Sequence, residues 1–207
     1  MHRDMMSFLL LLLEWKDFTK EQIISFQIVG GIMGTIGALL GGVLGDYFAQ
    51  HSHGRVGVAI FSVLSGIVFY GLFLFAETYS ICIICYGLFH LTGGWCPAAA
   101  CRPLCAELAQ NKSERAQIVA AWVLLEKTSS SVFGAPLVGF LTRRLFDENS
   151  VSTNQDKARV LARNMFLLST FFWSICAYFF IMMGRAEHNR KLEVELKNKR
   201  GRSPSLV

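Results

Sequence analysis

The sequence predicts an all-α protein, a polytopic bundle of transmembrane helices with five full spans and one partial span. Of its 207 residues, 53% are apolar and only 17% are charged. The apolar residues stand in long blocks with the charges between them, which is typical of a chain that crosses a membrane several times. The blocks show almost none of the polar stripe that surface helices of soluble proteins carry.

The first apolar block, residues 5–13, is too short to cross a bilayer, which takes about 20 residues. It could be a signal-peptide core behind Arg3, but Glu14-Trp15-Lys16 offers no small-residue cleavage site. Alternatively, this block is the last half of a span whose beginning is missing, and these residues alone leave both interpretations open.

Five longer blocks follow, and each is long enough for a full span. They cover residues 22–49, 56–76, 79–105, 117–142 and 161–184. The first of them is rich in glycine and longer than the hydrocarbon layer, so it must tilt or protrude. Polar loops at 106–116 and 143–160 separate the last spans.

Residues 185–207 form a basic tail that supplies most of the net charge of +5. Its basic residues are Arg185, Arg190, Lys191, Lys197, Lys199, Arg200 and Arg202. Such a tail could bind nucleic acid, but next to a membrane span it is better explained as a cytoplasmic flank held near anionic lipid. We therefore expect no nucleic-acid partner.

The stretch from Gly41 to Arg55 organises the rest of the chain. Glycines at 37, 41 and 45 recur every four residues, so on a helix they share one face that a neighbouring backbone can approach closely. The apolar run ends on the carboxylate of Asp46, and Gly54-Arg55 opens the next run after a short polar loop.

Gly42-x-x-x-Asp46 followed by Gly54-Arg55 resembles the signature loop of the major facilitator superfamily, which joins the second and third helices of each six-helix half on the cytoplasmic side. Tyr47 stands where the family usually has a basic residue, and the loop is longer than the common form, which resembles Spinster-like and plant or protist members. The resemblance implies that the chain is the C-terminal six-helix half of a transporter, with the Gly42–Arg55 loop after the eighth helix. Because the family has a helix before the first full span, we favour residues 5–13 as the last half of a span, and residues 1–184 as one transmembrane half-bundle.

The resemblance also implies a gating latch at this loop. In the family, the aspartate holds the inner ends of neighbouring helices together in the outward-open state. Carried over, Asp46 would pair with Arg102, with the N-terminus of the fourth full span, or with both, and Gly42, Gly45, Gly54 and Arg55 would complete the site. The alternative is a static interfacial ion pair, or an Arg102 that reaches the lipid phosphates.

Three ionisable residues inside predicted spans are candidates for a cavity or for ion coupling. Glu126 and Lys127 are adjacent and so point about 100° apart on a helix, which prevents simple side-by-side pairing. At least one should face the central cavity, since charges in a span are costly elsewhere. Glu126 could titrate as a proton-coupling group, Lys127 could hold an anionic group, and His90 could relay protons. Each could instead be satisfied locally.

A helix bend is predicted at Gly134-Ala135-Pro136-Leu137-Val138-Gly139, where proline frees a carbonyl and the flanking glycines permit bending. It resembles the Gly-Pro-rich bend of facilitator helices five and eleven. A second break is expected at Gly93-Gly94 and Pro97. Interrupted membrane helices tend to mark substrate sites and gates.

The distribution of basic residues predicts the orientation. With the 47–55 loop inside, the cytoplasmic side collects eleven basic residues (Arg55, Arg102, Lys112, Arg115 and the seven of the tail) against seven outside. This modest excess favours a multi-pass membrane protein with a cytoplasmic C-terminal tail. The sequence does not indicate which membrane.

Cofactor chemistry is not expected. Cys82-x-x-Cys85 has no second pair and no histidine at zinc spacing, so no metal site is predicted. There is no phosphate loop, nucleophile elbow or dinucleotide fingerprint. Because Glu126 and His90 lie on different predicted helices, a membrane-embedded enzyme is disfavoured.

The function expected from these patterns is secondary-active transport of a small solute by alternating access. The expected partners are the lipid bilayer, the small-molecule substrate, H⁺ or another coupling ion, and either the missing N-terminal six-helix half or a second copy. The alternative is a half-transporter that does not transport and acts as a membrane receptor or regulatory subunit.

Overall fold

The computed structural model describes residues 6–49, 54–93, 111–133, 135–149 and 153–201, and all its regular elements are helices. These are α1 (Met6–Trp15), α2 (Lys20–Ala49), α3 (Gly54–Phe75), α4 (Tyr79–Gly93), α6 (Lys112–Phe133), α7 (Ala135–Asn149) and α8 (Asn154–Gly201). The all-α prediction is therefore confirmed for this part of the chain.

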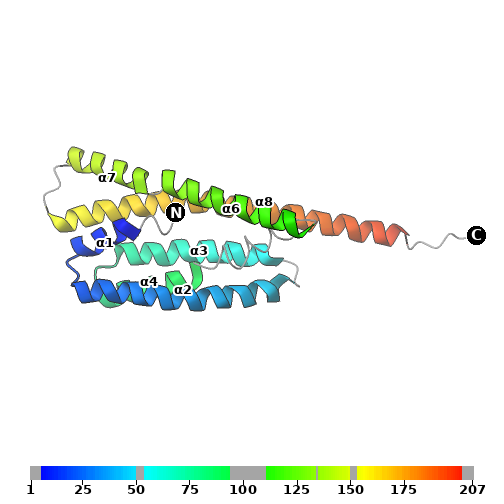
Figure 1. The fold of residues 1–207 in the computed structure, drawn as a ribbon, viewed down its shortest axis with the longest axis horizontal. Coiled ribbons are helices and arrows are strands. Elements are labelled where there is room, and N and C mark those ends of the chain that lie inside the picture. The colour runs from blue at the N-terminus through cyan, green and yellow to red at the C-terminus, as the bar shows by residue number, and fades with distance from the viewer. Residues whose placement is uncertain (1–5, 50–53, 94–110, 134, 150–152, 202–207) are drawn as a thin grey trace, which may run out of the picture.

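The helices run lengthwise, and successive helices reverse direction except α6 and α7, which follow one another in the same direction (Figure 1). α3 packs against α2, α4 and α8, and α4 also packs against α2. On the other side, α8 contacts α7 and α1. α3 and α8 therefore form the centre of the bundle, and the C-terminal part of α8 extends beyond it (Figure 1).

Local side-chain caps define where several helices begin. At the start of α2, the Gln22 N–H donates to Thr19 Oγ1 at 3.3 Å and the Thr19 N–H donates to Gln22 Oε1 at 3.0 Å, which is a capping box. At the start of α8, the Asp156 N–H donates to Thr153 Oγ1 at 3.2 Å. Asn111 Oδ1 caps α6 by accepting from the Glu114 N–H at 2.9 Å. These caps satisfy backbone donors that have no partner inside the helix.

An aromatic cluster holds α2, α3 and α4 together. Phe26 of α2 lies 6.0 Å from Phe73 of α3 and 5.5 Å from Tyr86 of α4, measured between ring centroids. Tyr70 extends the cluster to α8 through Trp173, with centroids 5.6 Å apart. Leu9, Leu12 and Leu13 of α1 are buried in the same core. Large aromatic rings dominate such cores because each of them buries a large apolar area away from water.

Three helices are long and apolar enough to cross a membrane: Lys20–Ala49, Gly54–Phe75 and Asn154–Ala186. Their outer faces are apolar and exposed. On α2 the exposed large apolar residues are Ile24, Ile28, Ile32, Ile36, Leu39, Leu40, Val43, Tyr47 and Phe48. Soluble monomers rarely expose apolar surface on this scale, so the membrane character predicted from the sequence is supported.

Five full spans were expected, and within the described residues three of them are long and apolar enough to cross a membrane. α4 is apolar but has 15 residues up to Gly93, beyond which the segment 94–110 lies outside the described part. The expected span 117–142 is divided between α6 and α7, and α6 is less apolar because it contains Glu126, Lys127 and four serines. The described structure therefore leaves these two spans as predictions.

The predicted polar loop at 143–160 is largely helical. α7 continues to Asn149, and α8 begins at Asn154. The charged residues here lie at helix ends, where polar side chains stay in contact with solvent and local caps stabilise the helical conformation. The tail is also helical, continuous with α8 as far as Gly201.

Candidate functional site: a helix-end ion pair and a glycine-lined helix contact

The end of α2 and the start of α3 are joined by an ion pair. Arg55 Nη2 lies 2.9 Å from Asp46 Oδ1. Gly54, with a φ of 55°, begins α3 in the left-handed region that glycine enters without strain, and this places Arg55 in the first turn of α3. The Arg55 side chain is 19% exposed and that of Asp46 is 76% exposed. The two residues that carry the signature resemblance therefore touch each other.

The structure brings together part of the predicted latch. The resemblance places Arg55 in the site but implies Arg102, the N-terminus of the fourth full span, or both as the partner of Asp46. Arg102 and Pro97 lie outside the described residues, so a contact between Asp46 and Arg102 stays a prediction. Proximity along the chain was the signal for Arg55, since the ends of two antiparallel helices joined by a short loop are necessarily close.

The glycines of the signature differ in what they contact. Gly37, Gly41 and Gly45 are buried on one face of α2, as their spacing predicts. Gly42 lies on another face, where a β-carbon would have no neighbour within 4 Å. Close packing among the described residues therefore uses the four-residue glycine repeat and does not use Gly42.

The ion pair is expected to contribute a modest, salt-sensitive energy. In a double-mutant cycle of Asp46→Asn and Arg55→Gln, we expect a coupling of about 0.2–1 kcal/mol at low ionic strength, because one partner is largely exposed to solvent. The coupling should shrink in high salt. Unfolding of the purified protein in detergent measures it. A coupling that is zero in low salt, or that does not respond to salt, contradicts this assignment.

His90 lies in the contact between α4 and α2. A β-carbon at Gly30 would stand 3.2 Å from His90 Nε2, and one at Gly34 would stand 3.6 Å from Nδ1. The imidazole also packs edge-on against Tyr86, with centroids 4.5 Å apart. The half-buried ring thus fills the space above small residues of α2. A role for His90 in a cavity or in proton relay remains a prediction.

The C-terminal end of α4 is wedged between two helices. A β-carbon at Gly37 of α2 would lie 2.7 Å from the carbonyl oxygen of Leu91. On the other side, a β-carbon at Gly66 of α3 would lie 3.3 Å from the Cα of Gly93. Ser62 Oγ donates to the Thr92 carbonyl oxygen at 2.9 Å. Backbones that approach so closely need small residues on both sides.

The glycine spacing predicts a close backbone approach at Gly37, but Ser62 and Gly66 were not among the predicted residues. The available signal was their spacing of four residues on a span, which puts both small side chains on one helix face. The same pattern on two neighbouring helices would have indicated that both pack on a third.

The remaining predicted residues are not gathered at one place. Lys127 is exposed on α6, and the side chain of Glu126 lies outside the described part. The helix boundary between α6 and α7 falls where the bend was predicted, although Gly134 itself is not described. Pro136 occupies the first turn of α7, where its missing N–H costs little. Gly139 faces Phe8 of α1, whose ring would lie 3.4 Å from an added β-carbon.

Lys16 is a feature that the sequence did not indicate. Its ammonium donates to the carbonyl oxygens of Leu74 at 2.8 Å and Ala76 at 2.7 Å, at the C-terminal end of α3. These carbonyls have no intrahelical donor, and the cation also lies favourably at the negative end of the helix dipole. Burial lowers the pKa of Lys16 below its usual 10.5, partly offset by the nearby Cys82 and Glu77.

Within the described residues, no group of three or more His, Cys, Asp or Glu side chains could hold a metal ion. No family model, curated protein or solved structure matches this chain. The resemblance to the major facilitator superfamily therefore depends on the sequence motifs alone.

Proposed function

We propose that this helical bundle is embedded in a membrane and works as one half of a secondary transporter of the major facilitator type, moving a small solute by alternating access. The observation that carries the proposal is the Asp46–Arg55 pair, which joins the two helix ends that the signature loop connects. An ion pair between these helix ends fits a transporter family in which this loop controls the cytoplasmic end of the solute pathway.

The exposed apolar faces support the membrane part of the proposal. Only 17% of the most apolar stretch of α2 is buried within the bundle. The outer faces of α3 and α8 are similar, with Val68, Leu72, Leu167 and Phe171 exposed. Lipid or a second bundle would cover these faces, whereas exposing so much apolar surface to water would be unfavourable in free energy.

The ion pair would act as a weak bias on a conformational equilibrium. An interaction of about 0.2–1 kcal/mol changes the ratio of two states only about 1.4- to 5-fold. That is useful only if the inward-facing and outward-facing states are close in energy, as alternating access requires. Solute and coupling-ion binding would supply the larger driving energy, with His90, Glu126 and Lys127 as the candidate groups.

Uptake by sealed vesicles tests the proposal. Vesicles that contain the tagged protein together with its second bundle, identified by crosslinking, are incubated with a mixture of small organic solutes, and their contents are measured by mass spectrometry. We expect at least one solute to accumulate, and the uptake rate to change in Asp46→Asn. Release of the protein by alkaline extraction contradicts membrane embedding. Binding of a solute without accumulation supports the receptor alternative instead.

The proposed orientation makes a separate prediction. The 190–207 tail and Asn111 should both face the cytoplasm. An antibody to the tail should therefore label cells only after permeabilisation, and the Asn111-Lys112-Ser113 sequon should stay unmodified. Labelling of intact cells, or a glycan on Asn111, would reverse the orientation without affecting the transport proposal.

A further inference from the structure

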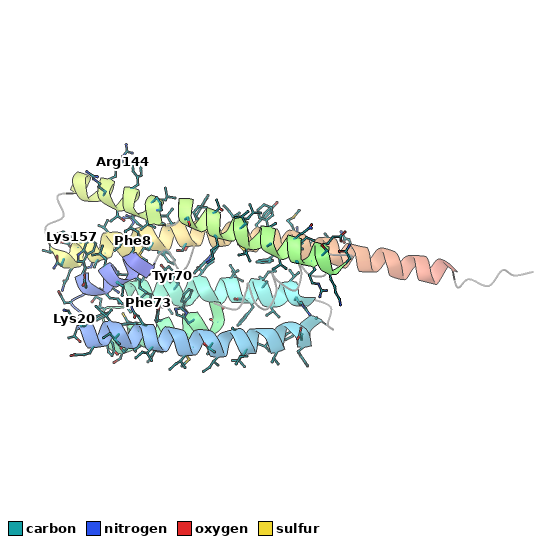
Figure 2. The ribbon with its side chains drawn as sticks, viewed as in Figure 1. Phe8, Lys20, Tyr70, Phe73, Arg144 and Lys157 are labelled. Carbon is teal, nitrogen blue, oxygen red and sulfur yellow. The ribbon has the colours of Figure 1, made fainter. Side chains whose placement is uncertain are left out.

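A pocket of about 430 Å³ opens at the end of the bundle opposite the Asp46–Arg55 pair. It lies where α1 ends, α3 ends and α8 begins. Figure 2 shows the basic side chains of Lys20, Arg144 and Lys157 at this same end. The volume falls in the range of small-ligand pockets, about 300–1,000 Å³.

The pocket has an excess of positive charge. Lys16, Arg159 and Arg163 line it, against the single carboxylate of Glu77. Arg159 Nη2 and Glu77 Oε1 are 3.5 Å apart, which is long for a charge-assisted hydrogen bond, and both side chains are exposed. The described part of the chain places no carboxylate within ion-pair distance of Arg163, so its guanidinium is available.

Helix geometry aligns the two arginines. Arg159 and Arg163 are four residues apart on α8, so they lie one above the other on the same face. Lys16 reaches the pocket from the opposite wall, where it is fixed by the carbonyl oxygens of Leu74 and Ala76. The two planar guanidinium groups match the oxygens of a phosphate group, and Lys16, whose ammonium is directed at Leu74, Ala76 and Cys82, adds positive charge nearby.

Apolar side chains of α3 and α8 complete the lining of the pocket. Leu74, Phe75, Ala158 and Ala162 line it. Phe75 is exposed and continues along α3 into the outward-facing side chains of Leu72 and Val68. An apolar chain leaving the pocket would therefore follow a surface that the proposed function places against lipid.

We propose that this pocket binds a phosphate group, carried by an anionic phospholipid whose acyl chains lie along α3. The guanidinium groups of Arg159 and Arg163 hold the phosphate oxygens, and Phe75 separates the headgroup from the chains. Glu77 competes with the phosphate for Arg159. The inference needs only the membrane embedding of the proposed function and is independent of transport.

Binding of phosphatidylglycerol to the detergent-solubilised full chain, measured by native mass spectrometry against phosphatidylcholine, tests the lipid. We expect Arg163→Gln and Arg159→Gln each to weaken phosphatidylglycerol binding about tenfold, the size expected for one charge-assisted contact. Arg144→Gln removes the same charge at the same end but outside the pocket and should leave binding unchanged. Equal loss in Arg144→Gln would mean a general surface attraction and would overturn the site.

Three further measurements make the result specific. Arg163→Lys keeps the charge but loses the bidentate fork, so it should restore only part of the affinity. Glu77→Gln should tighten binding because it frees Arg159, and weaker binding would contradict the proposed arrangement.

Inorganic phosphate in place of lipid distinguishes a free anion from a lipid headgroup. Stabilisation by phosphate that Arg163→Gln abolishes shows that a free anion suffices, whereas binding of phosphatidylglycerol alone shows that the acyl chains are needed. Binding of neither overturns the proposal, whether or not the chain transports a solute.

Discussion

Replacing Gly37 with alanine is expected to destabilise the bundle by about 3 kcal/mol, at the upper end of the usual cost of overpacking. The added methyl would lie 2.7 Å from the Leu91 carbonyl oxygen and 2.8 Å from that of His90. Both obstacles are backbone atoms, which cannot rotate away as a side chain can. α4 would have to move away from α2, and the Ser62–Thr92 contact on its other side would be disturbed.

Gly31→Ala is the matched control for this prediction. It adds the same methyl to the same helix, six residues earlier, where no atom lies within 4 Å. Alanine is a better helix former than glycine by about 1 kcal/mol, so Gly31→Ala should be neutral or stabilising. The two variants therefore differ in sign. Denaturant unfolding of each purified variant, followed by circular dichroism, measures both, and equal stabilities would contradict the close contact of α2 and α4.

Lys16→Met should cost about 1–3 kcal/mol, although it replaces a loop residue by an apolar one of similar length. The change leaves the carbonyl oxygen of Leu74 without its donor, leaves that of Ala76 with only the weak thiol donor of Cys82, and removes a positive charge from the C-terminal end of α3. Lys16→Arg keeps the charge and the donors and should recover part of the loss. Lys20→Met, an exposed position on α2, serves as the control and should change stability by less than about 0.5 kcal/mol.

The contribution of Lys16 should also depend on pH. Its pKa in the folded protein is lowered by burial, whereas in the unfolded chain it stays near 10.5. Between these two values the unfolded state binds more protons, so the free energy of unfolding rises with pH. The stability difference between the wild type and Lys16→Met should therefore grow as the pH approaches 10.5. A difference that shrinks in this range would mean that the ammonium is stabilised rather than penalised by its surroundings.

The fold was predictable where apolar length decides the structure. Residues 22–49, 56–76 and 161–184 were expected to be spans, and α2, α3 and most of α8 coincide with them. Helix ends outside the apolar blocks were not predicted, because hydropathy carries no information about them. The pattern Thr153-x-x-Asp156 is typical of a helix N-cap and predicts the start of α8 inside the expected loop.

The candidate site was predictable only in part, for a related reason. The Gly-x-x-x-Asp pattern and Gly54-Arg55 indicated the correct two helix ends, but a sequence does not say which cation reaches a given carboxylate. Lys16 gave no signal at all, since its partners are two backbone carbonyls more than fifty residues away. Contacts to backbone atoms depend on how helices are arranged in space, which residue types alone do not specify.

The unbroken run of α8 has a mechanical consequence. Its 48 residues form one helix about 72 Å long, more than twice the thickness of a bilayer core. Because the tail is continuous with the part of α8 that packs on α3, the two parts would move together. A tilt of about 10° around Thr170 would carry Gly201 sideways by roughly 8 Å at a rise of about 1.5 Å per residue. Small rearrangements within the bundle would thus become large displacements at the far end, where a soluble protein could detect them.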